Sequence, residues 1–345
     1  MVFSALIEKG EWAGEVSLLE ALFAALARAE DRVSRLDERV RGSGFRDGWR
    51  SRADIRAVIG AMAADGAHVH PEDLILHDLG TDTRLPETAV AKARDLLQAR
   101  RKAQRGGSEL LSWSGLAWLS GLTQREPPPG ARPTAHIAGG PAPVSGYAAL
   151  VRFFESIAKG DTESPRAAVE DCLGVLDLPR VPPLLQAAAL TEAWRIVDPL
   201  PRRRPMGGLA AAMVLKTTAR FSSGLFPLEV ALGRGAFPGR LAWAPIGERL
   251  AYWVAQLELA AELELEELTR LGHQKARIER KAGGLRRSNR GPDLAKLAVD
   301  SPVITTESIS RTLGVTPQAS LQLVRRMGGV LHEITGRSRY RVWRL

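Results

Sequence analysis

Apolar side chains recur at three- and four-residue steps through most of the chain, and strand-like alternation is confined to its C-terminal part. One such stripe, between Val16 and Val40, predicts an amphipathic helix that ends before Gly42. Ser51 is suited to cap a second helix that continues through Met62, and similar helical patterns follow. We therefore expect a mainly α fold with a multi-helix N-terminal body.

A segment rich in proline and glycine interrupts these patterns. Residues 125–146 hold six prolines and four glycines among 22 residues, a composition that a single helix does not tolerate. We interpret this segment as a linker. The expected organisation is an N-terminal helical domain at 1–124, the linker at 125–146, a second helical region at 147–245, a long helix at 246–284 and a C-terminal domain at 285–345.

The predicted long helix carries an apolar stripe with alternating three- and four-residue spacing, and its last turns are basic. Two interpretations remain open: a core helix of the middle region, or a dimerisation helix that presents the stripe to a second copy. The stripe comprises Leu250, Val254, Leu257, Ala261, Leu265, Leu268 and Leu271, and the basic end comprises Lys275, Arg277, Arg280 and Lys281.

Three short helices are predicted after the long one, at 292–299, 307–313 and 317–327. Between the second and the third, Gly314 supplies a left-handed backbone position and Thr316 is suited to cap the helix that begins at Pro317. This arrangement is typical of a helix-turn-helix. The third helix is expected to bury Ser320, Leu323, Val324 and Met327 and to expose Gln318, Leu321, Gln322 and Arg325.

A hairpin is predicted directly behind the third helix. Residues 330–334 alternate like a strand, 335–338 form a turn, and 339–343 return. A hairpin in this position is the wing of a winged helix-turn-helix, so the expected fold is mainly α with a C-terminal winged helix-turn-helix. The side chains expected to meet phosphates or a minor groove are Arg337, Arg339 and Arg341, and those expected to pack are Tyr340, Val342 and Trp343.

The charge of the chain is concentrated in the same C-terminal segment. Residues 272–345 contain 15 Lys+Arg and 5 Asp+Glu, a net of +10, whereas the other 271 residues contain 33 and 34, a net of −1. Such a footprint around a helix-turn-helix favours nucleic acid as the partner. Besides the residues already named, the predicted DNA contacts are Thr316, Arg326, Arg286 and Arg287.

We interpret the chain as a sequence-selective protein that binds double-stranded DNA, and specifically as a transcriptional regulator. Glutamine pairs with adenine and arginine with guanine in the major groove, so the exposed face of the third helix would select the bases. A homodimer is expected because one short recognition helix gives limited specificity. An architectural or plasmid-maintenance role, and RNA or protein as the partner of the same module, remain alternatives.

Composition narrows the classes of protein to which the chain can belong. Hydrophobic residues make up 45% of the chain and charged residues 25%, as in ordinary globular proteins. The single cysteine, Cys172, permits no intrachain disulfide and favours a reducing cytoplasm. No apolar run approaches the roughly 18 residues of a membrane span, so no membrane association is expected.

Several segments also resemble a known family. LGVTPQASLQLV followed by EITGRSRYRVW resembles the C-terminal helix-turn-helix of an uncharacterised bacterial family that is often plasmid-borne. EDRVSRLDERVRGSGF, HVHPEDLILHDLGTDTRLP and KTTARFSSGLFPLEVALG are similar to its N-terminal domain of unknown function. The resemblance implies a helical domain joined to a DNA-binding tail, and it implies no reaction.

An alternative hypothesis is an enzyme acting on nucleic acid or nucleotide, with a site at His68–Arg84 and a DNA-targeting tail. That segment holds three of the six histidines, yet its spacing matches no established metal signature, and helix capping or a pocket for an unknown effector explains it more simply. Fic-type nucleotide transferases need a His-Pro-Phe loop and a Gly-Asn-Gly-Arg cradle, but here His70-Pro71 precedes Glu72 and the cradle is missing. No cofactor is expected.

Overall fold

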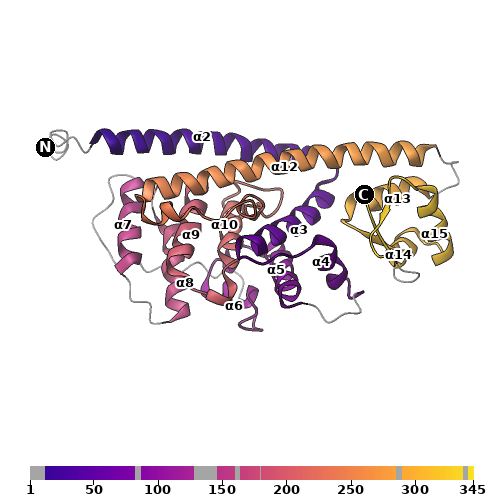
Figure 1. Ribbon diagram of the computed structural model, residues 1–345, viewed down its shortest axis with the longest axis horizontal. Helices are drawn as coiled ribbons and strands as arrows, with labels where there is room; N and C mark the ends of the chain where they lie inside the picture. The colour runs from indigo at the N-terminus through magenta and orange to yellow at the C-terminus, as the bar shows by residue number, and fades with distance from the viewer. Residues whose placement is uncertain are drawn as a thin grey trace.

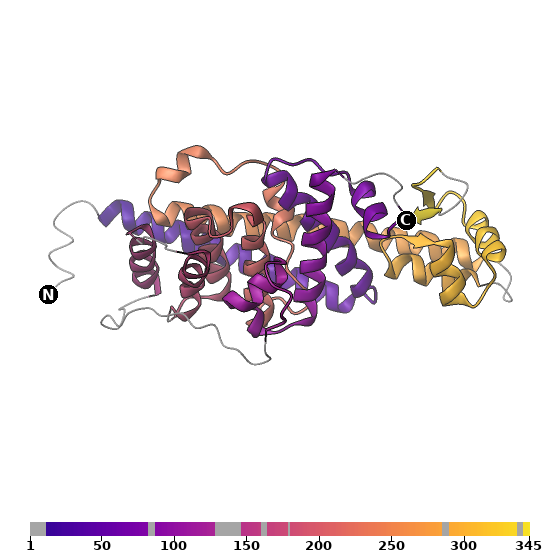
Figure 2. The same ribbon diagram turned by 90° about the horizontal axis from the view of Figure 1, so that it is seen from below.

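The computed structural model describes residues 12–81, 87–127, 146–159, 164–178, 180–284, 290–336 and 341–345, with side chains from residue 21 onward. The molecule is elongated and almost entirely helical, and its C-terminal unit lies at one end (Figures 1 and 2). The body helices are α2 (Trp12–Gly42), α3 (Arg46–Ala64), α4 (Pro71–Asp78), α5 (Thr88–Arg105), α6 (Trp113–Leu119), α7 (Gly146–Lys159), α8 (Pro165–Leu173), α9 (Pro183–Val197), α10 (Met206–Thr217), α11 (Glu229–Leu232) and α12 (Ile246–Gly283). Short 3-10 turns lie at Ser108–Leu110, Gly174–Asp177, Pro201–Arg203 and Gly239–Trp243.

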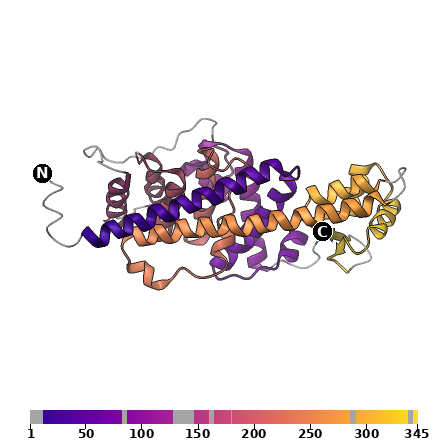
Figure 3. The same ribbon diagram turned by 90° about the horizontal axis from the view of Figure 1, so that it is seen from above.

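The two longest helices, α2 and α12, lie side by side (Figure 3), along one edge of the molecule as Figure 1 shows it. They run parallel, because every polar contact between them joins residues 230 positions apart. These contacts are solvent-exposed and contribute little individually, so the apolar seam between the helices supplies most of the stability. The contacts are Arg28 to Glu258 at 3.2 Å, Arg32 to Glu262 at 3.1 Å and Arg39 to Thr269 at 3.2 Å.

The apolar stripe of α12 is buried inside the chain itself, which confirms the core-helix interpretation. Its members are at most 4% exposed, with one exception: Leu265 is only partly buried. Between Ala261 and Leu268 the buried positions are instead Leu263 and Glu264, and Glu264 accepts hydrogen bonds from Arg56 of α3 at 2.8 and 2.5 Å. The stripe is therefore covered by the chain's own helices, and the alternative interpretation, that it faces a second copy, does not agree with this burial.

The remaining body helices pack beneath this pair, and a buried ion cluster joins three of them. Arg100 of α5 is fully buried and donates to Asp54 of α3 at 2.9 Å and to Glu229 of α11 at 3.1 and 3.2 Å. Burial lowers the pKa of Arg100, but Glu229 and Asp54 outweigh it and hold that pKa above its ordinary value. Burial raises the pKa of Glu229 above its ordinary value, and Arg100 opposes this shift. The cluster therefore places one arginine between two buried carboxyl groups from two other helices.

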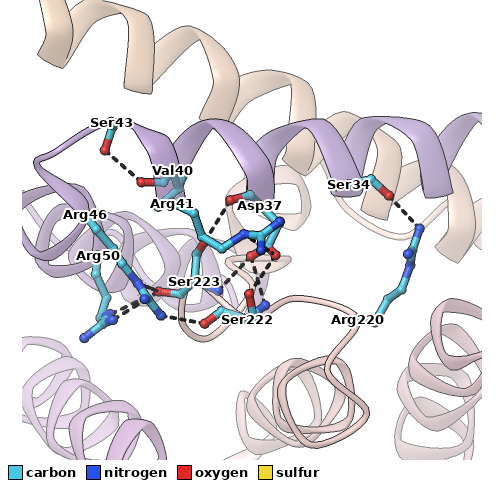
Figure 4. A network of polar contacts seen from close by, with 10 residues as sticks. All are labelled: Ser34, Asp37, Val40, Arg41, Ser43, Arg46, Arg50, Arg220, Ser222 and Ser223. Carbon is cyan, nitrogen blue, oxygen red and sulfur yellow. Dashed lines mark hydrogen bonds and ion pairs between the residues drawn. The ribbon is translucent and has the colours of Figure 1, made fainter.

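A second polar network fastens the loop after α10 to α2 and α3 (Figure 4). The Asp37 carboxylate accepts from the backbone N–H of Ser222 at 2.9 Å and of Ser223 at 2.7 Å. Arg46 and Arg50 donate to the Ser223 carbonyl oxygen at 3.0 and 3.2 Å. Two of the segments that carry the family resemblance, one in α2 and one after α10, thus meet in the structure, and here their polar residues hold the fold together.

Most helices begin close to where the sequence predicts, and one begins elsewhere. The predicted helix at Pro71 is confirmed, and the His70 side chain accepts from the backbone of Glu72 at its N-terminus. Ser51, expected to begin a helix, lies inside α3 and donates to the carbonyl oxygen of Asp47 at 2.9 Å. A serine hydroxyl can also bond to a carbonyl oxygen of the preceding turn, as here, and the helix begins about one and two-thirds turns before the predicted cap. Residues 128–145 of the proposed linker lie outside the described residues, and its last residue, Gly146, begins α7.

The C-terminal unit contains three helices and a small antiparallel sheet. The strand order is β1-β3-β2, with Ile304 paired to Trp343 and Glu333 paired to Trp343 on its other side. The two-residue strand β1 is too short for alternation to reveal, and the sequence did not predict it. The elements are α13 (Gly291–Asp300), β1 (Ile304–Thr305), α14 (Thr306–Leu313), α15 (Pro317–Arg326), β2 (His332–Glu333) and β3 (Val342–Arg344). Among the described residues, no helix combines the length and apolarity needed to cross a bilayer.

Candidate nucleic-acid interface

The turn between α14 and α15 has the geometry that the sequence predicts. Gly314 is left-handed, with φ of 66°, and its N–H donates to the Ser310 carbonyl oxygen at 3.0 Å. The Thr316 side chain accepts from the Ala319 N–H at 3.2 Å and so caps α15. The hydroxyls of Ser310 and Ser320 meet at 3.0 Å and join the two helices where they are closest. Local contacts therefore fix the angle at which α15 leaves the turn.

Helix α15 has one buried face and one open face. Ser320, Leu323, Val324 and Met327 are buried, as predicted. The opposite face is open except for Leu321, which is half-buried, and the helix lies at the outer end of the molecule, away from the body (Figure 1). The exposed side chains are Gln318, Gln322, Arg325 and Arg326. This face is free to approach a ligand without any movement of the body.

The basic end of α12 reaches the same unit. Ile278 and Ala282 are buried where α12 packs against α13, and Arg277 donates to the Gly329 carbonyl oxygen just after α15. Lys275 pairs with Glu279 at 2.7 Å, so part of its charge is compensated. Helix α12 thus belongs to the body and to the C-terminal unit at once, and it brings its cations to the side of α15.

Several exposed cations at the end of α12 and on α15 form no ion pair with any residue that the structure describes, and four of them stand out as candidate phosphate contacts. Unpaired exposed arginine and lysine side chains are available to phosphate oxygens. The four are Arg280, Lys281, Arg325 and Arg326.

Arg341 of the wing, which the sequence assigns to a phosphate or a minor groove, is bonded within the wing itself. Arg341 donates to Glu333 across the hairpin at 2.9 Å, and its guanidinium lies over the Trp343 ring at 5.4 Å from the centroid. This hydrogen bond lowers the pKa of Glu333 below its ordinary value. Arg341 therefore serves the wing's own structure as well as any ligand. The other two arginines of the wing that are expected to contact DNA, Arg337 and Arg339, lie outside the described residues, as do Tyr340, Arg286 and Arg287.

A residue that the sequence did not single out attaches this unit to the body. Arg52 of α3 donates to the carbonyl oxygens of Val299 at 2.7 Å, Ala298 at 2.8 Å and Ser301 at 2.7 Å, at the C-terminal end of α13. A cation favours this end of a helix, where carbonyl groups lack intrahelical partners. Burial, together with the neighbouring Arg56, lowers the pKa of Arg52 to about 10. No motif marks such a residue, because its partners are backbone groups.

The histidine-rich segment considered as an enzyme site has structural roles where it is described. His70 caps α4, and Asp78 accepts from Arg101 at 2.7 Å and from Gln98 at 2.8 Å. Within the described ranges, no three His, Cys, Asp or Glu side chains gather closely enough to hold a metal ion. Asp82 and Arg84 lie outside those ranges. The described contacts thus give His70 a capping role and Asp78 a role in packing α4 against α5.

Comparison with known proteins supports a two-part chain. Residues 292–345 match the model of an HTH DNA binding domain, and residues 171–283 match that of a protein of unknown function, DUF1612. The uncharacterized protein y4cF of Sinorhizobium fredii (strain NBRC 101917 / NGR234) is 31% identical over 357 residues, which cover 90% of this chain and 93% of that protein.

A solved structure also aligns over most of the chain. The crystal structure of a Fic family protein from Desulfovibrio desulfuricans G20 matches with a TM-score of 0.49 and 12% identity, over 94% of this chain and 95% of that one. No conclusion about chemistry follows from a likeness at this level.

Proposed function

Since the chain belongs to the bacterial family that joins a DUF1612 domain to a C-terminal helix-turn-helix DNA-binding domain, we propose that it is a sequence-selective regulator of transcription. Helix α15 would enter the major groove of double-stranded DNA, and the basic end of α12 and the wing would contact phosphates. The observation that carries the proposal is the open face of α15, on which Gln318, Gln322 and Arg325 stand free of other described side chains.

The chemistry of that face suits base recognition. Glutamine and arginine each make two hydrogen bonds to a purine edge, and each such pair discriminates by about 1–3 kcal/mol. The unpaired cations beside α15 would add attraction that depends on salt and not on sequence. Helix α15 would select the bases and the neighbouring cations would attract the phosphates, so mutations can separate the two contributions to DNA binding. The proposal places the protein in the cytoplasm, where bacterial DNA lies.

Pairing of two copies is part of the proposal. One recognition helix of ten residues covers few base pairs, and two-fold partners double the site at half-site spacings of roughly 34 Å. The pairing surface must lie elsewhere than the α12 stripe, which the chain's own helices cover. Light scattering of the full chain, alone and with a palindromic duplex, would show the stoichiometry.

Selection from a random duplex library tests the proposed recognition. The wild-type chain is expected to enrich one motif, and Gln322→Ala and Arg325→Ala are each expected to relax the preference at one position by roughly 1–3 kcal/mol. Glu307→Ala, at a similarly exposed site on α14, serves as the control and should leave the motif unchanged.

Two outcomes would contradict the proposal. Enrichment of no motif by the wild-type chain would remove sequence selectivity. An unchanged motif in both variants would show that another surface selects the bases.

A further inference from the structure

A cleft of about 430 Å³ lies where the body meets the C-terminal unit. Its walls come from α3, α4 and α12 on one side, and from the loop before β1 and the ends of β2 and β3 on the other. A cavity of this size suits a small molecule, and joints between two folded units are common ligand sites. The cleft is distinct from the open face of α15.

The lining of this cleft is rich in arginine. Five arginines and one glutamate line it, and three further acids, Glu264, Glu72 and Asp300, lie near individual arginines of this set. The arginines are Arg52, Arg56, Arg270, Arg277 and Arg344, and the glutamate is Glu267.

Two of the five guanidinium groups have no carboxylate within ion-pair distance among the described residues. Arg52 and Arg277 donate to backbone carbonyl oxygens, which are dipoles and do not cancel a charge. Burial is the main cause of the lowered pKa of Arg52, the neighbouring Arg56 lowers it further, and Asp300 opposes both only in part. An anion in the cleft would supply the missing charge.

Hydrogen-bond donors also remain free at this place. The side chains of Gln274 and His332 line the cleft and have no partner among the described residues, and Arg270 uses one nitrogen on Glu267 at 2.6 Å. Arginine presents its N–H groups in a planar fork that matches the oxygens of a carboxylate or a phosphate. The cleft thus offers both charge and directed donors to the same kind of group.

We propose that this cleft binds a small polyanion with phosphate or carboxylate groups, which acts as an effector of DNA binding. The regulatory part rests on the function proposed above. Arg270 and Gln274 belong to α12, whereas His332 and Arg344 belong to the sheet behind α15, so one ligand would join the two units. Arg277 also donates a hydrogen bond to the carbonyl oxygen of Gly329, in the segment that follows α15. Occupancy would therefore change how firmly α15 is held relative to the body.

Thermal unfolding of the full chain with sodium pyrophosphate and, separately, sodium citrate tests the site. Sodium chloride at matched ionic strength is the reference, and the two probes distinguish phosphate from carboxylate ligands. At least one probe is expected to raise the Tm with saturation, because a ligand of the native state stabilises it by mass action. Arg270→Glu and Arg270→Gln should each raise the midpoint, the probe concentration that gives half of the Tm increase, by roughly tenfold or more.

Arg35→Glu is the matched control. Arg35 is an exposed arginine of a one-turn ion pair, like Arg270, but it lies on α2 and does not line the cleft. The control should keep the wild-type midpoint. Equal midpoints in the Arg270 variants and the wild type, or full reproduction of the effect by chloride, would overturn the site.

Anisotropy of a labelled duplex separates the site from the function. A saturating probe is expected to shift the DNA affinity of the wild type and the Arg35→Glu control several-fold, and to leave that of Arg270→Glu unchanged. If the full chain binds no DNA while Arg270-dependent anion binding persists, the proposed function fails and the anion site stands. If Arg270→Glu alone weakens DNA binding much more than Arg35→Glu, the cleft holds DNA phosphates and the effector proposal is wrong.

Discussion

Two arginines of the body and two of the C-terminal unit have opposite surroundings. In the body, Arg100 and Arg56 are paired with buried carboxylates that hold them in place. In the C-terminal unit, Arg325 and Arg326 stand exposed without an ion pair among the described residues. The net charges of −1 and +10 for the two sequence segments reflect the same contrast.

The difference separates cations that hold the fold from cations that are available to a partner. A buried arginine without a carboxylate is costly, and Arg100 and Arg56 are each paired with an acid. An exposed arginine costs little and gains when a phosphate arrives. Arg52 and Arg277 stand between these cases, because they are bonded to carbonyl oxygens and not to acids.

The largest expected effect of a single change is on the buried cluster. Arg100→Ala leaves Asp54 and Glu229 buried without their cation, and we expect a loss of roughly 3–5 kcal/mol in the free energy of unfolding. Urea denaturation followed by circular dichroism measures it. Arg166→Ala removes an arginine whose side chain is 65% exposed, and it should change the same free energy by less than about 1 kcal/mol. Similar losses in the two variants would erase the distinction between the regions.

A smaller effect is expected at the attachment between them. Arg52→Ala removes three charge-assisted hydrogen bonds to the end of α13, and we expect a loss of about 2–3 kcal/mol. Amide hydrogen exchange should accelerate in α13 and leave α9 unchanged. Arg32→Ala, which breaks an exposed pair between α2 and α12, is the control. Unaltered exchange in α13 would show that packing of α12 alone holds the unit.

The smallest effect on stability is expected at the free cations. Arg280→Ala and Lys281→Ala should leave the free energy of unfolding within about 0.5 kcal/mol of the wild type. Each should reduce the slope of log affinity for DNA against log salt by about 1, across specific and unrelated duplexes alike. Titrations at several salt concentrations measure the slope. An unchanged slope in both variants would mean that the end of α12 does not contact DNA.

Much of the candidate interface was predictable because it is local. The Gly314 turn, the Thr316 cap and the two faces of α15 depend on residues within about ten positions of one another. The helical body was predictable for the same reason. The helix start at Ser51 was not, since serine has two local bonding choices and the sequence does not rank them.

The sequence by itself determined which segments are helices, where the turn of the helix-turn-helix lies and which end of the chain is basic. Only the tertiary structure decided that α2 and α12 run parallel with a constant offset of 230 residues. The packing of α12 within the chain covers the stripe that was considered as a dimerisation surface. The tertiary structure likewise decided that Arg52 caps α13 and that a basic cleft forms beside it. The physical reason is distance along the chain: periodicity and capping act between neighbours, whereas these contacts join remote segments, partly through carbonyl groups that every residue shares.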